Sequence, residues 1–218
     1  MAQNRNYYVD NSPSTMKQDT LFAIATFIFL FIVSFICSIV LGMGKAESLH
    51  EPSSLWMYAR RWLMIIFGLL IPWLRGKDNL TAFGWKAESK WIFITIGAGV
   101  LIGLGNKGGF DPASLIAVIL ALFHTFATEL FFRRYLLKTF SALFTSLWPP
   151  ILLSSFMYGL FYLTVWTTWG LPIPGRIIFV FLFTGLGILF SYSYKKSGCF
   201  LVPWLMHFFG VLSYRMLF

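Results

Sequence analysis

The sequence predicts an all-α membrane protein, a bundle of about seven transmembrane helices. Of its 218 residues 58% are hydrophobic and only 11% are charged, whereas an average soluble domain carries about 25% charged residues. Apolar stretches recur along the whole chain. The aromatic residues, 20% of the total, often lie at the ends of these stretches, where amphipathic rings favour the membrane interface. A surface this poor in charge suits lipid as its solvent.

Seven apolar segments are expected to form the helices. The first is long enough to cross a bilayer, and it is longer than the apolar region of a signal peptide, so it is interpreted as a retained helix. The segments are 21–41, 55–74, 91–104, 113–132, 147–166, 177–192 and 199–217. The third and the sixth are short for a full span, so they are expected to begin earlier or to be tilted.

Proline and glycine mark the ends of these segments. Pro149 and Pro150 open the fifth segment, and the stretch 170–175 is predicted to be a turn. Pro203 lies within the seventh segment and should kink it or mark its start. No soluble domain fits between the segments. The chain therefore divides into a polar cytoplasmic N-terminal part, 1–19, and a transmembrane domain, 20–218.

The net charge of +9 would suggest a nucleic-acid partner in a soluble chain. Here the basic residues flank apolar segments, so the charge indicates topology and membrane lipid, not nucleic acid. With seven spans, one side of the membrane carries eleven Lys and Arg residues and the other carries six, Arg60 and Arg61 among them. Because cytoplasmic loops are enriched in Lys and Arg, we expect a cytoplasmic N-terminus in a bacterial plasma membrane.

Ionisable residues inside apolar segments are candidates for function. The densest group is His124, Glu129, Arg133 and Arg134. Glu129 and Arg133 are spaced i, i+4 on a helix and can pair directly. They form either part of a functional site or a structural ion pair that fastens the helix to its neighbours. Arg134 is expected to extend its charge to the membrane interface.

His207 lies midway along the last segment, where it either bonds a neighbouring helix or acts as a base. Cys37 and Cys199 show no disulfide framework and no metal-binding spacing. We therefore predict no metal site and no cofactor.

Three separated motifs resemble the CAAX-protease and bacteriocin-processing (CPBP, or Abi) family, which includes type II CAAX prenyl endopeptidases. That family's EExxxR motif corresponds to Thr128-Glu129-Leu130-Phe131-Phe132-Arg133, and its FxxxH motif to Tyr158-Gly159-Leu160-Phe161-Tyr162. Its HxxxN motif corresponds to the stretch from His207 to Val211, preceded by a similar turn at 194–199. A turn at 83–85 also resembles the family, so that the likeness covers a CPBP-like core of about 83–211.

The resemblance implies an intramembrane protease fold, yet three motif residues depart from the family pattern. Where the family has its first Glu, its second-motif His and its Asn, this chain has Thr128, Tyr162 and Val211. Thr and Tyr are unsuited as general bases near neutral pH, and Val211 offers no oxyanion donor.

Two interpretations remain. The chain is a catalytically degenerate protease homologue that binds or scaffolds a membrane or envelope partner. Alternatively, it is an active CAAX-type endopeptidase with Glu129 as base and His207, with His124, as helpers. A transporter or channel is disfavoured because the sequence lacks mirrored pairs of broken helices.

Overall fold

The computed structural model describes residues 13–40, 55–74, 88–104, 115–166 and 172–216, and within these ranges it is all-α. This confirms the predicted fold class. The helices are α1 (Pro13–Val40), α2 (Leu55–Ile65), α3 (Ile71–Leu74), α4 (Ser89–Leu104), α5 (Leu115–Glu129), α6 (Lys138–Ser141), α7 (Trp148–Trp166), α8 (Ile173–Ser197) and α9 (Leu201–Met216). Two π-helical segments, η1 (Ile66–Leu70) and η3 (Leu130–Leu137), connect α2 to α3 and α5 to α6.

Each apolar segment of the sequence contains a helix, although several boundaries differ. The first helix begins at Pro13, inside the segment assigned to the polar N-terminus. The stretch 170–175 is not wholly a turn, because Pro172 is the N-cap of α8 and Ile173 begins that helix. Pro203 is the third residue of α9 and so marks its start, at a position where proline leaves no intrahelical bond unmade.

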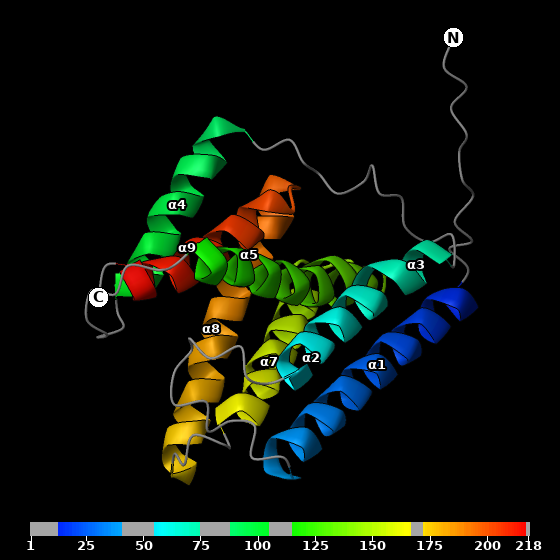
Figure 1. The fold of residues 1–218 in the computed structure, drawn as a ribbon. Coiled ribbons are helices and arrows are strands. Elements are labelled where there is room, and N and C mark those ends of the chain that lie inside the picture. The colour runs from blue at the N-terminus through cyan, green and yellow to red at the C-terminus, as the bar shows by residue number, and fades with distance from the viewer. Residues whose placement is uncertain (1–12, 41–54, 75–87, 105–114, 167–171, 217–218) are drawn as a thin grey trace.

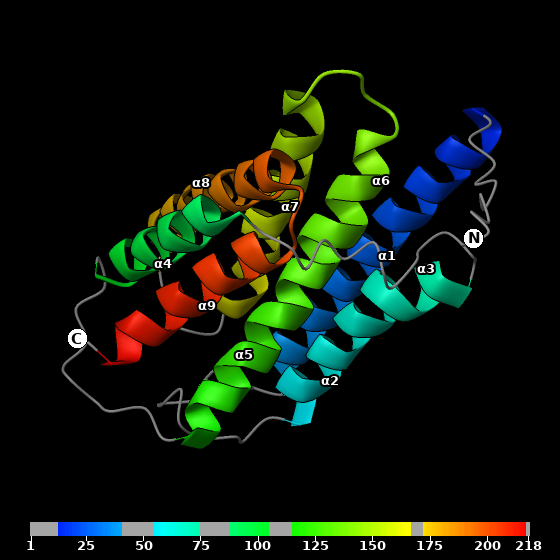
Figure 2. The ribbon, with the colours of Figure 1, turned by 90° about the horizontal axis from the view of Figure 1, so that it is seen from above.

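The continuous run of α5, η3 and α6 lies through the middle of the described helices (Figure 2). On one side lie α1 and the run of α2, η1 and α3, and on the other lie α4, α8 and α9 (Figures 1 and 2). Helix α7 packs against η3, α1 and, most extensively, α8, while α4 packs mainly on α9. The residues of η3 therefore face neighbours on several sides.

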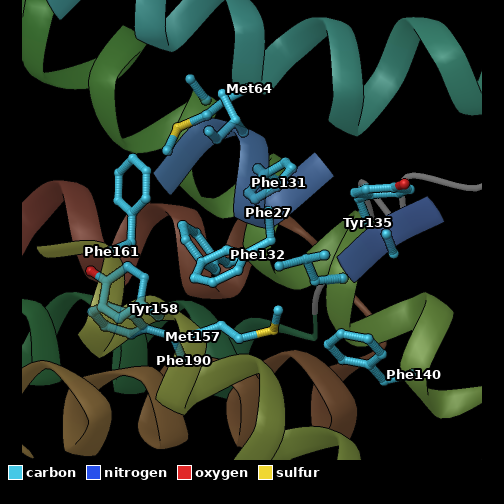
Figure 3. Close-up of a cluster of buried hydrophobic side chains, with 14 of the residues drawn as sticks. Phe27, Met64, Phe131, Phe132, Tyr135, Phe140, Met157, Tyr158, Phe161 and Phe190 are labelled. Atoms are coloured by element: carbon cyan, nitrogen blue, oxygen red, sulfur yellow. The ribbon is translucent and has the colours of Figure 1, made fainter. Parts of the chain in front are cut away.

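The core around η3 is unusually aromatic (Figure 3). Phe131 and Phe132 of η3 are fully buried, and Phe132 makes edge contacts with Phe27 of α1, Tyr158 and Phe161 of α7. Edge-to-face pairs of this kind add stabilisation beyond the apolar area they bury. The aromatic side chains thus join α1, η3 and α7 into one packed unit.

Two described helices are long and apolar enough to cross a membrane, namely Ser14–Cys37 within α1 and Ile173–Ser197, and the stretches Lys90–Ile102 and Leu201–Val211 are apolar but shorter. Helix α8 turns a row of apolar side chains outward, with Ile178 66% and Phe181 68% exposed. An exposed apolar face of this extent is typical of a surface that contacts lipid or another protein.

Candidate functional site

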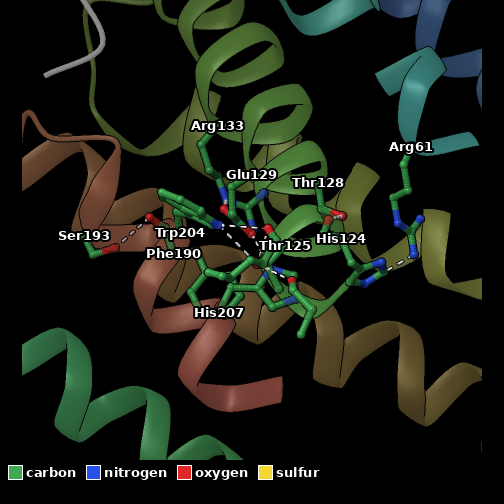
Figure 4. A network of polar contacts seen from close by, with 12 residues as sticks. Arg61, His124, Thr125, Thr128, Glu129, Arg133, Phe190, Ser193, Trp204 and His207 are labelled. Carbon is green, nitrogen blue, oxygen red and sulfur yellow. Dashed lines mark hydrogen bonds and ion pairs between the residues drawn. The ribbon is translucent and has the colours of Figure 1, made fainter. Parts of the chain in front are cut away.

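A buried carboxylate, that of Glu129, lies at the point where α5 becomes the π-helix η3 (Figure 4). Its side chain is fully buried. Glu129 Oε1 lies 2.8 Å from His207 Nδ1 of α9, and Glu129 Oε2 lies 3.1 Å from Arg133 Nε, four residues further along its own helix. Three residues that were singled out from the sequence are therefore brought together by the fold.

Arg133 is held by aromatic faces as much as by Glu129. The 3.1 Å approach of Arg133 Nε to Glu129 Oε2 is an ion pair without a well-aligned hydrogen bond, since neither atom meets hydrogen-bond geometry. The guanidinium carbon lies 4.5 Å from the ring centre of Tyr158 and 5.6 Å from that of Phe190. Cation–π contacts stabilise a guanidinium most when it is desolvated, as this fully buried one is.

His207 is enclosed by the same aromatic side chains. Its ring stacks on Phe190 at 5.2 Å between ring centres and makes edge contacts with Tyr158 and His124, each at 6.2 Å. Trp204, one turn earlier in α9, donates its indole N–H to the carbonyl of Leu122 and to Thr125 Oγ1 of α5. These contacts fix α9 against α5 and so fix the distance between His207 and Glu129.

The π-helical segment that follows Glu129 shifts the register of the side chains after it, and such segments are frequent at functional sites. Segment η3 packs against η1 of the second apolar run. Gly68 permits this packing, because a Cβ there would lie 3.2 Å from the Phe131 Cα. The sequence analysis missed both π segments. No glycine or proline marks η3, so no local signal in the chain predicts it.

The three positions that depart from the family motifs are placed differently. Thr128 is buried and donates its hydroxyl to the carbonyl of His124 at 2.8 Å, a bond within its own helix. Tyr162 stacks on Phe183 of α8 at 4.1 Å and makes an edge contact with Tyr158 at 5.0 Å. Val211 is partly buried in α9, one turn after His207.

Two predictions about arginines are wrong. Arg134 does not extend to the membrane interface, because its side chain is 1% exposed and lies inside the fold. Arg60 and Arg61 are not loop residues, because both lie within α2 and are buried, at 5% and 6% exposure. Arg61 Nη2 lies 3.3 Å from His124 Nε2, and Arg60 lies over the Phe161 ring at 5.2 Å. Nothing in the spacing of charges distinguishes such inward arginines from arginines in a loop.

No group of three or more His, Cys, Asp or Glu side chains that could hold a metal occurs among the described residues. Within the described part of the chain the chemistry therefore lies in a carboxylate, two imidazoles and several guanidinium groups. An all-α fold with ionisable groups enclosed by apolar helices is the arrangement of a helical membrane protein with a polar site in its interior.

The family model described as type II CAAX prenyl endopeptidase Rce1-like matches residues 111–212. Over this segment the chain belongs to that membrane-embedded family, which confirms the resemblance drawn from the three motifs. The match contains all three motifs but begins after the turn at 83–85, a turn that also lies outside the described residues. Comparisons with curated proteins and with solved structures gave no match.

Proposed function

We propose that this chain is a catalytically inactive member of the Rce1-like family that binds a membrane or envelope protein partner. One observation carries the proposal: both oxygens of the fully buried Glu129 carboxylate face side chains of the chain itself, His207 and Arg133. A general base must reach the water whose proton it takes. A carboxylate held in this way serves better as a structural tie between α5 and α9.

The neighbouring position supports the same proposal. Thr128 occupies the place of the family's first Glu, and its hydroxyl is bonded within its own helix. Tyr162 and Val211 replace two further motif residues. Neither Thr nor Tyr is a base at neutral pH, and valine has no polar group to stabilise an oxyanion. The fold is thus kept while the chemical groups of the motif positions are not.

An active endopeptidase is the second candidate, and the contact between Glu129 and His207 favours it. A carboxylate bonded to one imidazole nitrogen fixes the tautomer and leaves the other nitrogen to take a proton, as in hydrolases that use a carboxylate–histidine pair. In this arrangement His207 Nε2 is the base and Glu129 orients it. His124, whose ring edge contacts His207, is the nearest further imidazole.

A proteolysis assay separates the two candidates. The purified protein, reconstituted in lipid, is incubated with prenylated CAAX-type peptides and membrane-segment substrates, beside an active endopeptidase as positive control. We expect no cleavage. Cleavage by the wild type that disappears in a folded Glu129→Gln, His207→Ala variant would establish the enzyme. That variant should instead rescue the deletion phenotype and still copurify, in mild detergent, with the same membrane protein as the wild type.

We further propose a multi-pass arrangement in a bacterial plasma membrane with the N-terminus in the cytoplasm. The four buried arginines Arg60, Arg61, Arg133 and Arg134 do not act as loop charges. Omitting them leaves nine Lys and Arg residues on the proposed cytoplasmic side and four on the other, so the bias predicted by the positive-inside rule remains. In a cysteine-free background, a cysteine at position 80 should be labelled only from the cytoplasm and one at 171 only from outside. The opposite labelling pattern would reverse the orientation.

A further inference from the structure

Two adjacent arginines of α2, Arg60 and Arg61, lie on the opposite side of α5 from His207 and take no part in the Glu129 contacts (Figure 4). Both are buried by the described helices. Their neighbours are His124 of α5 at 3.3 Å from Arg61 and the Phe161 ring at 5.2 Å from Arg60. Tyr162 of α7 interacts electrostatically with both of them. The Arg60 Nε has no hydrogen-bond partner among the described residues.

The charge of this pair is not balanced within the described part of the chain. The carboxylates there are those of Asp19, Glu88 and Glu129. Glu88 pairs with Lys90 and Glu129 with Arg133 and His207, and no ion pair joins any of the three to Arg60 or Arg61. Phenol and imidazole groups are neutral at ordinary pH. Two like charges therefore lie side by side against aromatic and imidazole side chains.

Such an arrangement is unfavourable unless an anion joins it. Arginine stays protonated in proteins, so it does not relieve burial by losing its proton. A buried charge without a partner is strongly destabilising. The aromatic face of Phe161 compensates only a fraction of this. The most direct remedy is an anion from outside the chain, bound at the two guanidinium groups.

The donors present suit a phosphate group. Two guanidinium forks offer parallel N–H groups that match phosphate oxygens. The His124 ring and the Tyr162 hydroxyl add further donors beside them. A tetrahedral phosphate presents more oxygens than a carboxylate and thus satisfies more of these donors at once. The same helix also carries Trp62, which is 57% exposed beside Arg61. Exposed tryptophan is enriched at the depth of lipid headgroups.

We propose that Arg60 and Arg61, with His124 and Tyr162, form a phosphate-binding site within the helix bundle, and that the phosphate is that of an anionic lipid headgroup. Free inorganic phosphate carries the same chemistry, and the test below distinguishes the two sources. The site is separate from the Glu129 contacts, so it does not depend on whether the chain is a protease.

The test compares thermal stability of the full chain in nanodiscs of different composition. One set contains phosphatidylcholine alone, one contains added phosphatidylglycerol, and one contains phosphatidylcholine with inorganic phosphate in the buffer. We expect the wild type to melt several degrees higher with phosphatidylglycerol, the shift that mass action predicts for a ligand well above its dissociation constant. Protection by inorganic phosphate alone would support the site with free phosphate as its ligand.

A matched pair of variants assigns the effect to the two arginines. Arg60→Met with Arg61→Met removes two charges at roughly constant length, and apolar replacement of buried charges is often tolerated. Lys90→Met with Lys196→Met makes the same change in net charge at exposed positions. Phosphatidylglycerol binding, measured by native mass spectrometry, should weaken about tenfold or more in the arginine variant, as loss of a charged hydrogen bond implies. The lysine variant should bind as the wild type does.

Three outcomes would overturn the proposal. Equal wild-type stability in all three nanodisc preparations would show that the arginines are balanced by other means, such as a carboxylate outside the described residues. Equal protection by oleate, whose headgroup is a carboxylate, would remove the phosphate assignment. Equal loss of binding in both variants would reduce the effect to net charge. The wild-type comparison needs no variant, so it holds even if the methionine variant does not fold.

Discussion

The Glu129 centre and the Arg60–Arg61 pair lie on two faces of α5, and their charges are handled differently. At the Glu129 centre each charged group has a partner within the chain, since Arg133 and His207 contact the two carboxylate oxygens. At the Arg60–Arg61 pair the described residues supply an aromatic ring and an imidazole but no carboxylate. Both pairs are buried to a similar degree.

The difference shows that burial alone does not identify a binding site. A buried charge that is matched inside the chain holds helices together, and its removal should affect stability whatever the lipid. A buried charge without an internal match depends on what surrounds the protein. The two sites should therefore respond differently to mutation and to membrane composition, and three substitutions test this difference at decreasing size of effect.

The largest effect is expected for Glu129→Ala. The substitution leaves Arg133 buried without its counter-charge and His207 without its hydrogen-bond partner. Breaking a buried pair costs about 3–5 kcal/mol, and each kcal/mol lowers the melting temperature of a chain of this size by roughly 2–4 °C. Thermal unfolding in detergent, followed by circular dichroism, measures the shift.

The control for this prediction is the double variant Glu129→Ala, Arg133→Met. It removes the second charge together with the first, so part of the lost stability should return. The shift should also be the same in nanodiscs with and without phosphatidylglycerol. An unchanged melting temperature for Glu129→Ala would show that these groups do not form a stabilising buried pair.

A smaller effect is expected for Gly99→Ala in α4. A Cβ at this position would lie 2.7 Å from the Met206 carbonyl oxygen and from the Phe209 Cβ of α9. Overpacking of this kind typically costs about 1–3 kcal/mol. Because Met206 precedes His207, displacement of α9 should loosen the Glu129 centre and leave the Arg60–Arg61 pair unaffected. Melting temperature and phosphatidylglycerol binding, measured on the same variant, separate the two.

Gly97→Ala is the matched control, since a Cβ there meets nothing within 4 Å. Alanine is favoured over glycine in a helix by about 1 kcal/mol, so this variant should be as stable as the wild type or more so. If both glycine variants lower stability equally, close packing of α4 on α9 is not the cause.

The sequence predicted the helical segments well because long apolar runs leave few alternatives to a helix in a membrane. Its errors lie where polar or proline residues take part in helices. Proline at the start of a helix is compatible with helical geometry, so Pro172 and Pro174 stand at the beginning of α8 and do not form a separate turn. Helix α1 likewise begins at Pro13, before the apolar run starts.

The candidate site could be predicted only in part. The i, i+4 spacing and the motif resemblance identified Glu129, Arg133 and His207, and the structure places these three in contact. The inward positions of Arg60, Arg61 and Arg134 depend on how α2 and η3 pack, which a single sequence does not encode in any local pattern. The π-helical register of η3, which turns Arg133 and Arg134 into the core, has the same origin.

The smallest effect is expected for Trp204→Phe. The indole N–H of Trp204 donates to the Leu122 carbonyl at 3.3 Å and to Thr125 Oγ1 at 3.2 Å, while its ring packs on Phe126. Phenylalanine keeps an aromatic ring and removes the donor. A net hydrogen bond contributes about 0.5–1.5 kcal/mol, so the melting temperature should fall by only a few degrees.

Trp148→Phe makes the same chemical change at an exposed position, where the ring stacks on Tyr192, and it should leave stability nearly unchanged. The comparison isolates the bond that fixes α9 one turn before His207. Since Trp204 acts on the Glu129 centre and not on Arg60 or Arg61, phosphatidylglycerol should protect the Trp204→Phe variant as much as it protects the wild type. Reduced protection would mean that the two faces of α5 are coupled, and that the Glu129 centre and the arginine pair form a single site.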